Sequence, residues 1–159
     1  MLVWYFFYQR FINLNYRVEN SHFYYDTKEK MDGAIQFWLD SYQDKWFVRL
    51  AIVDKKISKA IGTIEMFHRP SDDAFDGDGL IRLDVRPDYE KTEEIQSIFA
   101  LLIPEAYTLL ECEEIITKIP LYAVERIDAA KKIGFEKTDR LLVGSEDRHA
   151  YKNYWAIRK

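Results

Sequence analysis

Residues 80–95, LIRLDVRPDYEKTEEI, contain the change of pattern that decides the fold. Apolar and charged side chains alternate up to Val85, which predicts a β-strand over Leu80–Val85 with one apolar face. Pro87 ends this strand, because proline has no amide hydrogen to donate to a neighbouring strand. From Thr92 onward the apolar residues recur every three or four positions, which predicts an amphipathic helix. A strand, a turn and a helix therefore follow one another here.

The chain before this stretch predicts helices followed by a hairpin. Residues 46–53 and 60–67 are β-rich runs on either side of a polar turn, a pattern typical of an antiparallel hairpin. Asp26 and Thr27 are typical N-cap residues of a helix before the hairpin. The apolar face of that helix consists of Met31, Ala34, Ile35, Trp38, Leu39 and Tyr42. Residues 4–18 carry another apolar stripe at helical spacing, with a strand over residues 4–8 as the alternative.

The chain after residue 95 predicts two more helices and three strands. The helix that begins at Thr92 should kink or break near Pro104, with residues 107–111 as a second piece. Residues 115–119 form a short buried strand, and residues 124–133 form a helix. Gly134 stands where a left-handed C-cap residue belongs. The last two strands are expected at residues 135–143 and 151–157.

Composition indicates a globular protein of one domain, spanning residues 1–159. The net charge of −4 and a pI near 5.5 argue against nucleic acid or an anionic membrane as the main partner. Cys112 is the only cysteine, so an intrachain disulfide and a cysteine-based zinc site are excluded. The apolar residues 2–8 are too short to span a bilayer and have no basic residues before them. We expect a soluble protein of a reducing, cytoplasmic compartment.

The order of elements, together with three segments, resembles the GNAT superfamily of N-acyltransferases. The segments are AIGTIE at residues 60–65, LDVRPDY at residues 83–89 and AAKKIGFE at residues 129–136. The resemblance implies an α+β fold with a central mixed, mostly antiparallel sheet flanked by helices. In this fold the strands Leu80–Val85 and Ile115–Ile119 are parallel and splayed apart, and a cofactor lies in the gap.

The resemblance also implies a function, the transfer of an acetyl group from acetyl-CoA to a primary amine. An acidic chain suits a small cationic amine or a peptide N-terminus as the acceptor. The alternative is a GNAT fold that has lost this chemistry and serves as a binding or oligomerisation module, for example as a homodimer. A third possibility is a protein that binds a longer acyl thioester. Fold analogy alone cannot separate these functions.

The family binds the pyrophosphate of CoA at a glycine-rich loop before a helix, because bare amides must approach the phosphates. The corresponding stretch here, residues 90–96, contains no glycine. Glu93 and Glu94 stand in the first helical turn, where carboxylates complement the helix dipole but repel phosphate. The backbone of residues 84–86 is expected to hold the pantetheine arm. The candidate cofactor-binding residues are Val85, Arg86, Lys91, Thr92, Glu93, Glu94, Ile95 and Gln96.

Three residues are candidates for acid–base catalysis. Glu65 and Asp84 lie on neighbouring strands, where related enzymes often place a general base. Their alternative interpretation is an ion pair with Arg49 or Arg82. Many family members place a tyrosine on the late helix to protonate the departing thiolate, but that position here is Ala130. Tyr122 is the nearest hydroxyl, with a packing role as the alternative.

Four aspartates, at residues 72, 73, 76 and 78, precede the strand Leu80–Val85. Their spacing does not match an EF-hand, which requires alternating ligands and a closing glutamate, so no metal site is expected. We expect a solvated acidic loop, which would suit the mouth of a site for a cationic substrate.

Overall fold

The protein is described by a computed structural model that covers residues 27–43, 47–68, 70–145 and 147–159. The helix or strand expected within residues 4–18 lies outside these residues. The elements follow in the order α1 (Lys28–Gln43), β1 (Phe47–Asp54), β2 (Lys59–His68), β3 (Gly79–Val85), α2 (Thr92–Leu109), β4 (Glu114–Lys118), α3 (Val124–Lys132), β5 (Glu136–Lys137), β6 (Leu142–Val143), β7 (Ala150–Tyr151) and β8 (Tyr154–Arg158).

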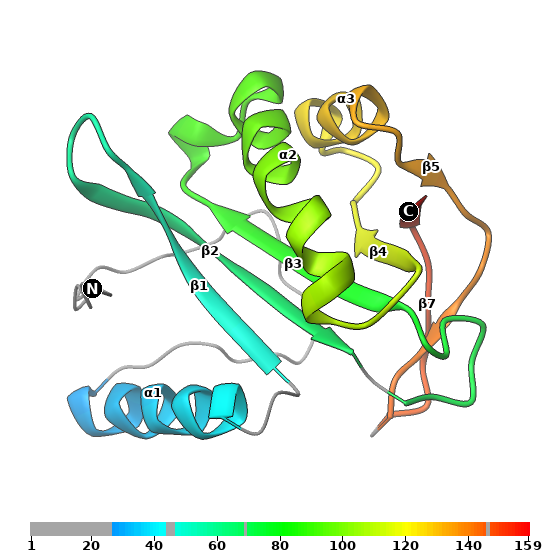
Figure 1. Cartoon of the computed structure of the whole chain (residues 1–159), viewed down its shortest axis with the longest axis horizontal. Coiled ribbons are helices and arrows are strands. Elements are labelled where there is room, and N and C mark those ends of the chain that lie inside the picture. Colours follow the sequence, from blue (N-terminus) through cyan, green and yellow to red (C-terminus); the bar gives the residue numbers. More distant parts are fainter. Residues whose placement is uncertain (1–26, 44–46, 69, 146) are drawn as a thin grey trace.

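The described strands form one six-stranded sheet, in the order β1-β2-β3-β4-β8-β5, and a separate pair, β6 and β7 (Figure 1). Neighbours in the main sheet are antiparallel except β3 and β4, which are parallel. The predicted hairpin is β1–β2, with Leu50 opposite Ile64. The mixed, mostly antiparallel sheet expected from the sequence is therefore confirmed.

The main core lies between the sheet and the two helices α2 and α3. Ile64, Ile81 and Ile115, from three neighbouring strands, pack in one cluster with Phe99 of α2. All four side chains are at most 1% exposed. Each buried aliphatic or aromatic side chain contributes about 1.5–3 kcal/mol relative to an exposed one. This cluster holds α2 and α3 on one face of the sheet.

The first described helix, α1, packs on the opposite face, against β1 (Figure 1). Side chains alternate along a strand, so Arg49 points away from the face that carries Val48 and the main core. The Trp38 ring lies 4.1 Å from the Arg49 guanidinium carbon, measured to the ring centroid. Five of the six predicted apolar positions of α1 are half-buried, whereas Tyr42 is exposed.

Of the two outcomes predicted at Pro104, the break with a second piece at residues 107–111 is wrong, because α2 runs without interruption from Thr92 to Leu109. The kink stays a prediction. Proline removes only the hydrogen bond to the carbonyl of Ala100. Ala100 and Pro104 are both exposed, so water can satisfy that carbonyl. Ile103 and Tyr107 are buried on either side of the proline. Packing of this face on the sheet keeps the helix in one piece.

The end of α3 is as the sequence predicts. Gly134 has a φ of +101°, in the left-handed region that side chains with a Cβ avoid. The amide of Phe135 donates to the carbonyl of Ala130 at 3.0 Å, which satisfies one carbonyl of the last turn. The expected glycine C-cap is confirmed.

The two long strands expected at the end of the chain are wrong. Residues 135–143 contain two short strands, β5 and β6, and residues 150–158 contain β7 and β8. β5 and β8 belong to the main sheet, whereas β6 and β7 form the separate pair. The first expected strand breaks at residues 138–141, where the Arg140 side chain turns toward Asp78 and Glu114. Local strand propensity did not indicate this long-range contact, which takes the chain out of the main sheet.

Candidate cofactor cleft

The candidate cofactor site begins where β3 and β4 part. The two strands pair only over residues 79–81 of β3 and 115–117 of β4. β3 then continues to Val85, whereas β4 ends at Lys118. A short 3-10 turn, Pro87–Tyr89, leads from the end of β3 to the start of α2 at Thr92 (Figure 1). The predicted splay is therefore confirmed.

The first amide of α2 already has an anionic partner. The Thr92 N–H donates to Oε2 of Glu125, on α3, at 2.8 Å, and the Thr92 hydroxyl donates to the same oxygen. These two hydrogen bonds, the hydroxyl's first, lower the pKa of the Glu125 carboxyl below its ordinary value. A helix N-terminus attracts anions through its amides and its dipole. Glu125 thus takes an amide that a phosphate would otherwise use.

Arg126, the next residue of α3, fills the gap beside β3. Its Nε and Nη2 donate to the two carboxylate oxygens of Glu90 at 2.7 Å each. Its Nη1 donates to the carbonyl of Leu83 at 2.6 Å. Leu83 lies beyond the pairing with β4, so this carbonyl has an arginine where a neighbouring strand would be. The arginine is only 4% exposed, as expected of a buried charge with a full set of partners.

Six of the predicted cofactor residues surround this helix start. Lys91 occupies the N-cap position and is exposed, as are Glu93 and Glu94 in the first turn. Thr92 and Gln96 are half-buried. Ile95 is fully buried in the main core. Glu93, Glu94 and Glu125 thus place three carboxylates at the start of α2, where the sequence predicts a pyrophosphate.

The end of β3 offers less to a ligand than the sequence suggests. Val85 is buried in the main core. The Arg86 amide donates to the carbonyl of Ile61 on β2 at 2.7 Å, so it is already used within the sheet. The Arg86 guanidinium is turned to Asp88, with Nη2 at 2.7 Å from Oδ2. Arg86 is therefore not directed at the first turn of α2.

The two candidate bases lie in different surroundings. Glu65 is 5% exposed, and its oxygens lie 3.1 Å from Arg49 Nη2 and 3.4 Å from Arg82 Nη1. The ion pair considered from the sequence is thus present with both arginines. Asp84 is half-buried in the part of β3 that extends beyond β4. Asp84 is the carboxylate at the splay.

The candidate proton donor, Tyr122, lies in the turn before α3 and is 64% exposed. The Tyr122 ring is therefore not packed in the core, so the packing role considered from the sequence is wrong. Ala130, at the position where the family often has tyrosine, is fully buried in the main core. No hydroxyl stands at that position.

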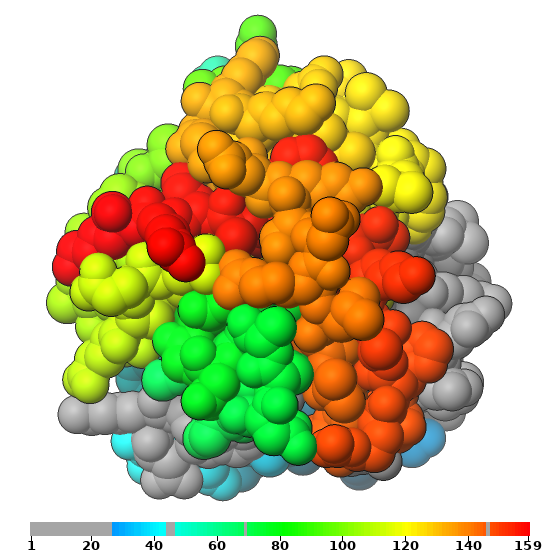
Figure 2. All heavy atoms as spheres, turned by 90° about the vertical axis from the view of Figure 1, so that its right-hand side faces the viewer, coloured from blue at the N-terminus to red at the C-terminus, as the bar shows by residue number. Residues whose placement is uncertain are grey.

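The acidic loop before β3 is solvated only in part, because Asp72 and Asp76 are exposed whereas Asp73 and Asp78 are half-buried in packed structure. It lies at the opposite end of β3 from the splay, against the end of the chain, as Figure 2 shows in green beside orange and red. Phe75 is 1% exposed, and its ring centroid lies 5.2 Å from that of Tyr154. Asp73 accepts hydrogen bonds from the amides of Phe75 and Val143, at 2.9 and 2.8 Å.

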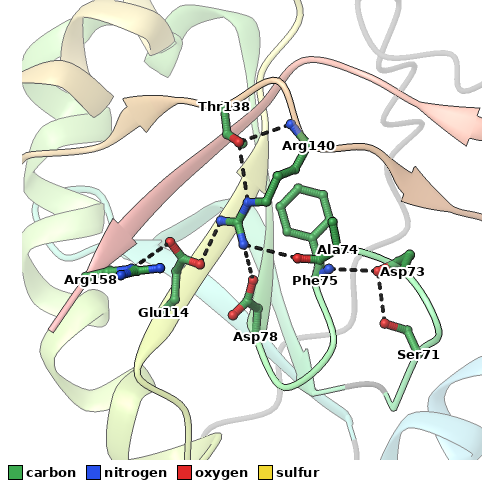
Figure 3. A network of polar contacts seen from close by, with 9 residues as sticks. All are labelled: Ser71, Asp73, Ala74, Phe75, Asp78, Glu114, Thr138, Arg140 and Arg158. Carbon is green, nitrogen blue, oxygen red and sulfur yellow. Dashed lines mark hydrogen bonds and ion pairs between the residues drawn. The ribbon is translucent and has the colours of Figure 1, made fainter.

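Arg140 is the centre of the polar network that holds this loop (Figure 3). Its Nη1 donates to Asp78 at 3.1 Å and to the carbonyl of Ala74 at 3.2 Å. Its Nη2 donates to Glu114, on β4, at 2.7 Å. Arg158 Nε donates to the other oxygen of Glu114 at 3.2 Å. The network joins the loop before β3 to β4 and to the last strand.

The two carboxylates of this network have opposite pKa shifts. Burial, and then the charge of Glu114, raise the pKa of Asp78 to about 6. Burial favours a higher pKa for Glu114 as well, but hydrogen bonds from Arg140 and Arg158 outweigh burial and hold this pKa below its ordinary value. Because two close carboxylates do not ionise independently, Asp78 takes up the first proton of the pair.

Three further observations concern cofactors and location. In the part of the chain that the structure describes, no three or more His, Cys, Asp or Glu side chains are grouped to hold a metal ion. Cys112 is buried, and burial raises the pKa of its thiol. None of the helices within the described ranges has the length and apolar character needed to cross a membrane.

Sequence reasoning missed Glu125, Arg126 and Arg140. Arg126 left a signal, because it lies three and four positions before Ala129 and Ala130, on the same helix face. A charge on the buried face of a helix needs a partner and points to a specific contact. Glu125 and Arg140 left no such signal, because their partners lie far away in the sequence.

Known proteins resemble this chain in structure and not in sequence. No family model matches the sequence, and no curated protein matches it. Solved structures do match. A ribosomal-protein-S5-alanine acetyltransferase from Vibrio fischeri has a TM-score of 0.62 and 14% identity, over 82% of this chain and 70% of that one. A spermidine N-acetyltransferase from Vibrio cholerae, in complex with CoA and spermine, has a TM-score of 0.58 and 12% identity, over 84% of this chain and 76% of that one.

These similarities define a class of fold. At such low sequence identities, structural similarity shows a shared fold and not a shared function. The chain has the fold of the GNAT superfamily of N-acetyltransferases, as its sequence motifs predict. Within that fold, Glu125 contacts the first amide of α2 and Arg126 contacts the carbonyl of Leu83 on β3.

Proposed function

We propose that this chain transfers an acetyl group from acetyl-CoA to a primary amine. The observation that carries the proposal is the parting of β3 from β4 after Ile81, with α2 starting beside the gap. Such a frame offers strand backbone to an extended pantetheine arm and helix amides to a pyrophosphate. Acetyl-CoA supplies the acetyl group as a thioester. A similar structure that contains CoA, the spermidine N-acetyltransferase, supports the choice of cofactor.

The backbone frame suits this cofactor, but the side chains now standing in it do not. Glu125 takes the first amide of α2, and Arg126 takes the carbonyl of Leu83. Glu93 and Glu94 repel a phosphate at the same helix turn. We therefore expect weak affinity for acetyl-CoA, because binding requires some of these contacts to break.

Asp84 is the better candidate for the general base. Both oxygens of Glu65 lie within ion-pair distance of guanidinium groups, so this carboxylate is already engaged in contacts within the sheet. Asp84 lies at the splay, where the amine and the thioester would meet, and would accept the proton of the attacking amine. Tyr122, exposed in the turn before α3, is the candidate that returns a proton to the thiolate. Glu65 then has the role of a structural ion pair.

The acceptor is a small cationic amine or a peptide N-terminus. The two solved structures described above are named for acceptors of these two kinds, a polyamine and the alanine of a ribosomal protein. A net charge of −4 favours a cationic acceptor through the field of the whole chain. A cytoplasmic location and a homodimer remain predictions.

A second candidate is a GNAT fold that no longer binds acetyl-CoA and serves as a binding or oligomerisation module. The absence of glycine from residues 90–96 and the buried Ala130 favour it. In this case Glu125 and Arg126 are permanent structural contacts.

An acetylation assay with spermidine and with a peptide that begins with alanine tests the proposal. Asp84→Asn should lower turnover by about 10²–10⁴ and leave the affinity for acetyl-CoA unchanged. Asp128→Asn, at an exposed position of α3, is the control and should keep native turnover. Full activity of Asp84→Asn would refute the assignment of the base. No binding of acetyl-CoA at millimolar concentration, measured by calorimetry, would favour the second candidate.

A further inference from the structure

The first turn of α3 contacts both the start of α2 and the splayed part of β3. Glu125 points to the start of α2, and Arg126 points to β3 and to Glu90. Successive residues of a helix point about 100° apart, so neighbouring positions can contact different elements. Glu90 and Thr92 lie on either side of the α2 N-cap, and α3 contacts both.

These contacts supply hydrogen-bond partners to backbone groups that have none within their own helix or sheet. The N-cap residue of α2, Lys91, makes no side-chain capping bond, and Glu125 acts as the cap from another helix. The carbonyl of Leu83 lies beyond the pairing of β3 with β4 and receives Arg126. An amide at a helix start and a carbonyl on a splayed strand are the groups that a pyrophosphate and a pantetheine amide would use.

The two contacts differ in how easily a ligand can displace them. Arg126 is 4% exposed and forms three hydrogen bonds of 2.6–2.7 Å. Glu125 is exposed, so water can solvate its carboxylate as soon as it leaves Thr92. An exposed hydrogen bond contributes little net stability, because water competes for both partners. Glu125 is the contact that opens, and Arg126 is the contact that anchors α3.

We infer that Glu125 is a latch on the proposed cofactor site: its carboxylate occupies the α2 N-terminus and is displaced by the pyrophosphate when acetyl-CoA binds. The inference rests on the proposed function and adds a regulation of the same site. Cofactor affinity is then set by competition between an internal carboxylate and an external phosphate for the Thr92 amide. A purely structural cap would stabilise α2 without affecting affinity.

Calorimetric binding of two probes, acetyl-CoA and inorganic pyrophosphate, tests the latch. Glu125→Ala should tighten the binding of both by about three- to tenfold, the effect of removing one competing hydrogen-bonded partner. Asp128→Ala is the matched control, since it removes the same charge from an exposed position of the same helix. The control should change either affinity less than twofold. Circular dichroism verifies that both variants keep the native helix content.

Equal affinities of Glu125→Ala and Asp128→Ala would overturn the latch, because net charge alone would explain the change. The NMR-measured pKa of Glu125 is a second readout: it should rise toward its ordinary value when acetyl-CoA binds, and a constant value would also overturn the latch. If no variant binds acetyl-CoA, the proposed function fails. The latch is then judged on pyrophosphate, where tighter binding by Glu125→Ala supports it and no change overturns it.

Discussion

Two arginines perform similar chemistry at opposite ends of β3. At the splayed end, Arg126 joins one carboxylate, Glu90, to the carbonyl of Leu83. At the paired end, Arg140 joins two carboxylates, Asp78 and Glu114, to the carbonyl of Ala74 (Figure 3). Both guanidiniums satisfy a backbone oxygen and neutralise nearby acids.

The difference lies in what surrounds each arginine. Beside Arg140, β3 and β4 are hydrogen-bonded, so the arginine adds side-chain contacts to strands that are already paired. Beside Arg126 the strands have parted, so the arginine takes the place of the missing neighbour. The same kind of ion pair therefore reinforces paired strands beside Arg140 and takes the place of a missing strand beside Arg126.

The largest effect is expected from Arg140→Met, measured by urea unfolding at pH 7. This change leaves the partly buried Asp78 without the guanidinium of Arg140 and leaves Glu114 with Arg158 alone, which should cost about 2–4 kcal/mol of unfolding free energy. Arg126→Met should cost less, about 1–3 kcal/mol, because one carboxylate, Glu90, and the carbonyl of Leu83 lose their partner, and the Glu90 side chain is already 17% exposed. A greater loss in Arg126→Met than in Arg140→Met would contradict the comparison.

A smaller effect should follow from Asp78→Asn, through pH. The folded pKa of Asp78, about 6, exceeds its ordinary 3.8, so the folded state binds more protons between these values. The native protein therefore loses stability as pH rises from about 4 to 6, by at most about 3 kcal/mol, and less because Glu114 and Arg140 are coupled to Asp78. Asp78→Asn removes this loss, so its stability relative to the native chain should improve by about 1–3 kcal/mol from pH 4.5 to 7.5.

The control for this pH dependence is Asp72→Asn, in the same loop. Asp72 is exposed, and its hydrogen bond from Arg148 lowers its pKa, so it titrates below this pH window. Its removal should leave the slope of unfolding free energy against pH unchanged between pH 4.5 and 7.5. If Asp72→Asn and Asp78→Asn alter that slope equally, Asp78 is not the group responsible.

The smallest effect is expected from the first turn of α2. The double variant Glu93→Gly, Glu94→Gly should bind acetyl-CoA about two- to tenfold more tightly at low salt, because two carboxylates no longer repel the pyrophosphate. The gain should shrink as salt rises, since both side chains are exposed and screened. The double variant with Gln at both positions separates lost charge from added flexibility, which costs about 1 kcal/mol per glycine. Tight native binding that neither variant alters would place the pyrophosphate elsewhere.

Much of the fold could be predicted from the sequence because its signals are local. The hairpin β1–β2, the strand β3 and the helix α3 with its glycine cap each have a periodicity or a turn residue of their own. The predicted break at Pro104 and the predicted strand at residues 135–143 were wrong for the same reason. In both places packing or a distant ion pair overrides the local pattern.

The candidate site could be predicted only in outline. Thr92, Glu93 and Glu94 were placed correctly at a helix start, because a strand, a turn and a helix are read directly from the sequence. The partner of Thr92 was not, because Glu125 lies 33 positions away. Composition predicts the exposure of Asp72 and Asp76 in the acidic loop, but it does not indicate that Phe75 anchors the loop in a core with Tyr154.

The sequence by itself determined the class of fold, the order of its elements and the loss of glycine from the phosphate loop. Only the tertiary structure decided which charges meet: Arg140 with Asp78, 62 positions apart, and Glu125 with the first amide of α2. The physical reason is that periodicity arises from neighbours along the chain, whereas ion pairs depend on how whole elements pack. Whether a carboxylate is exposed to solvent, held in an ion pair or hydrogen-bonded to a helix N-terminus therefore depends on partners that are distant in the sequence.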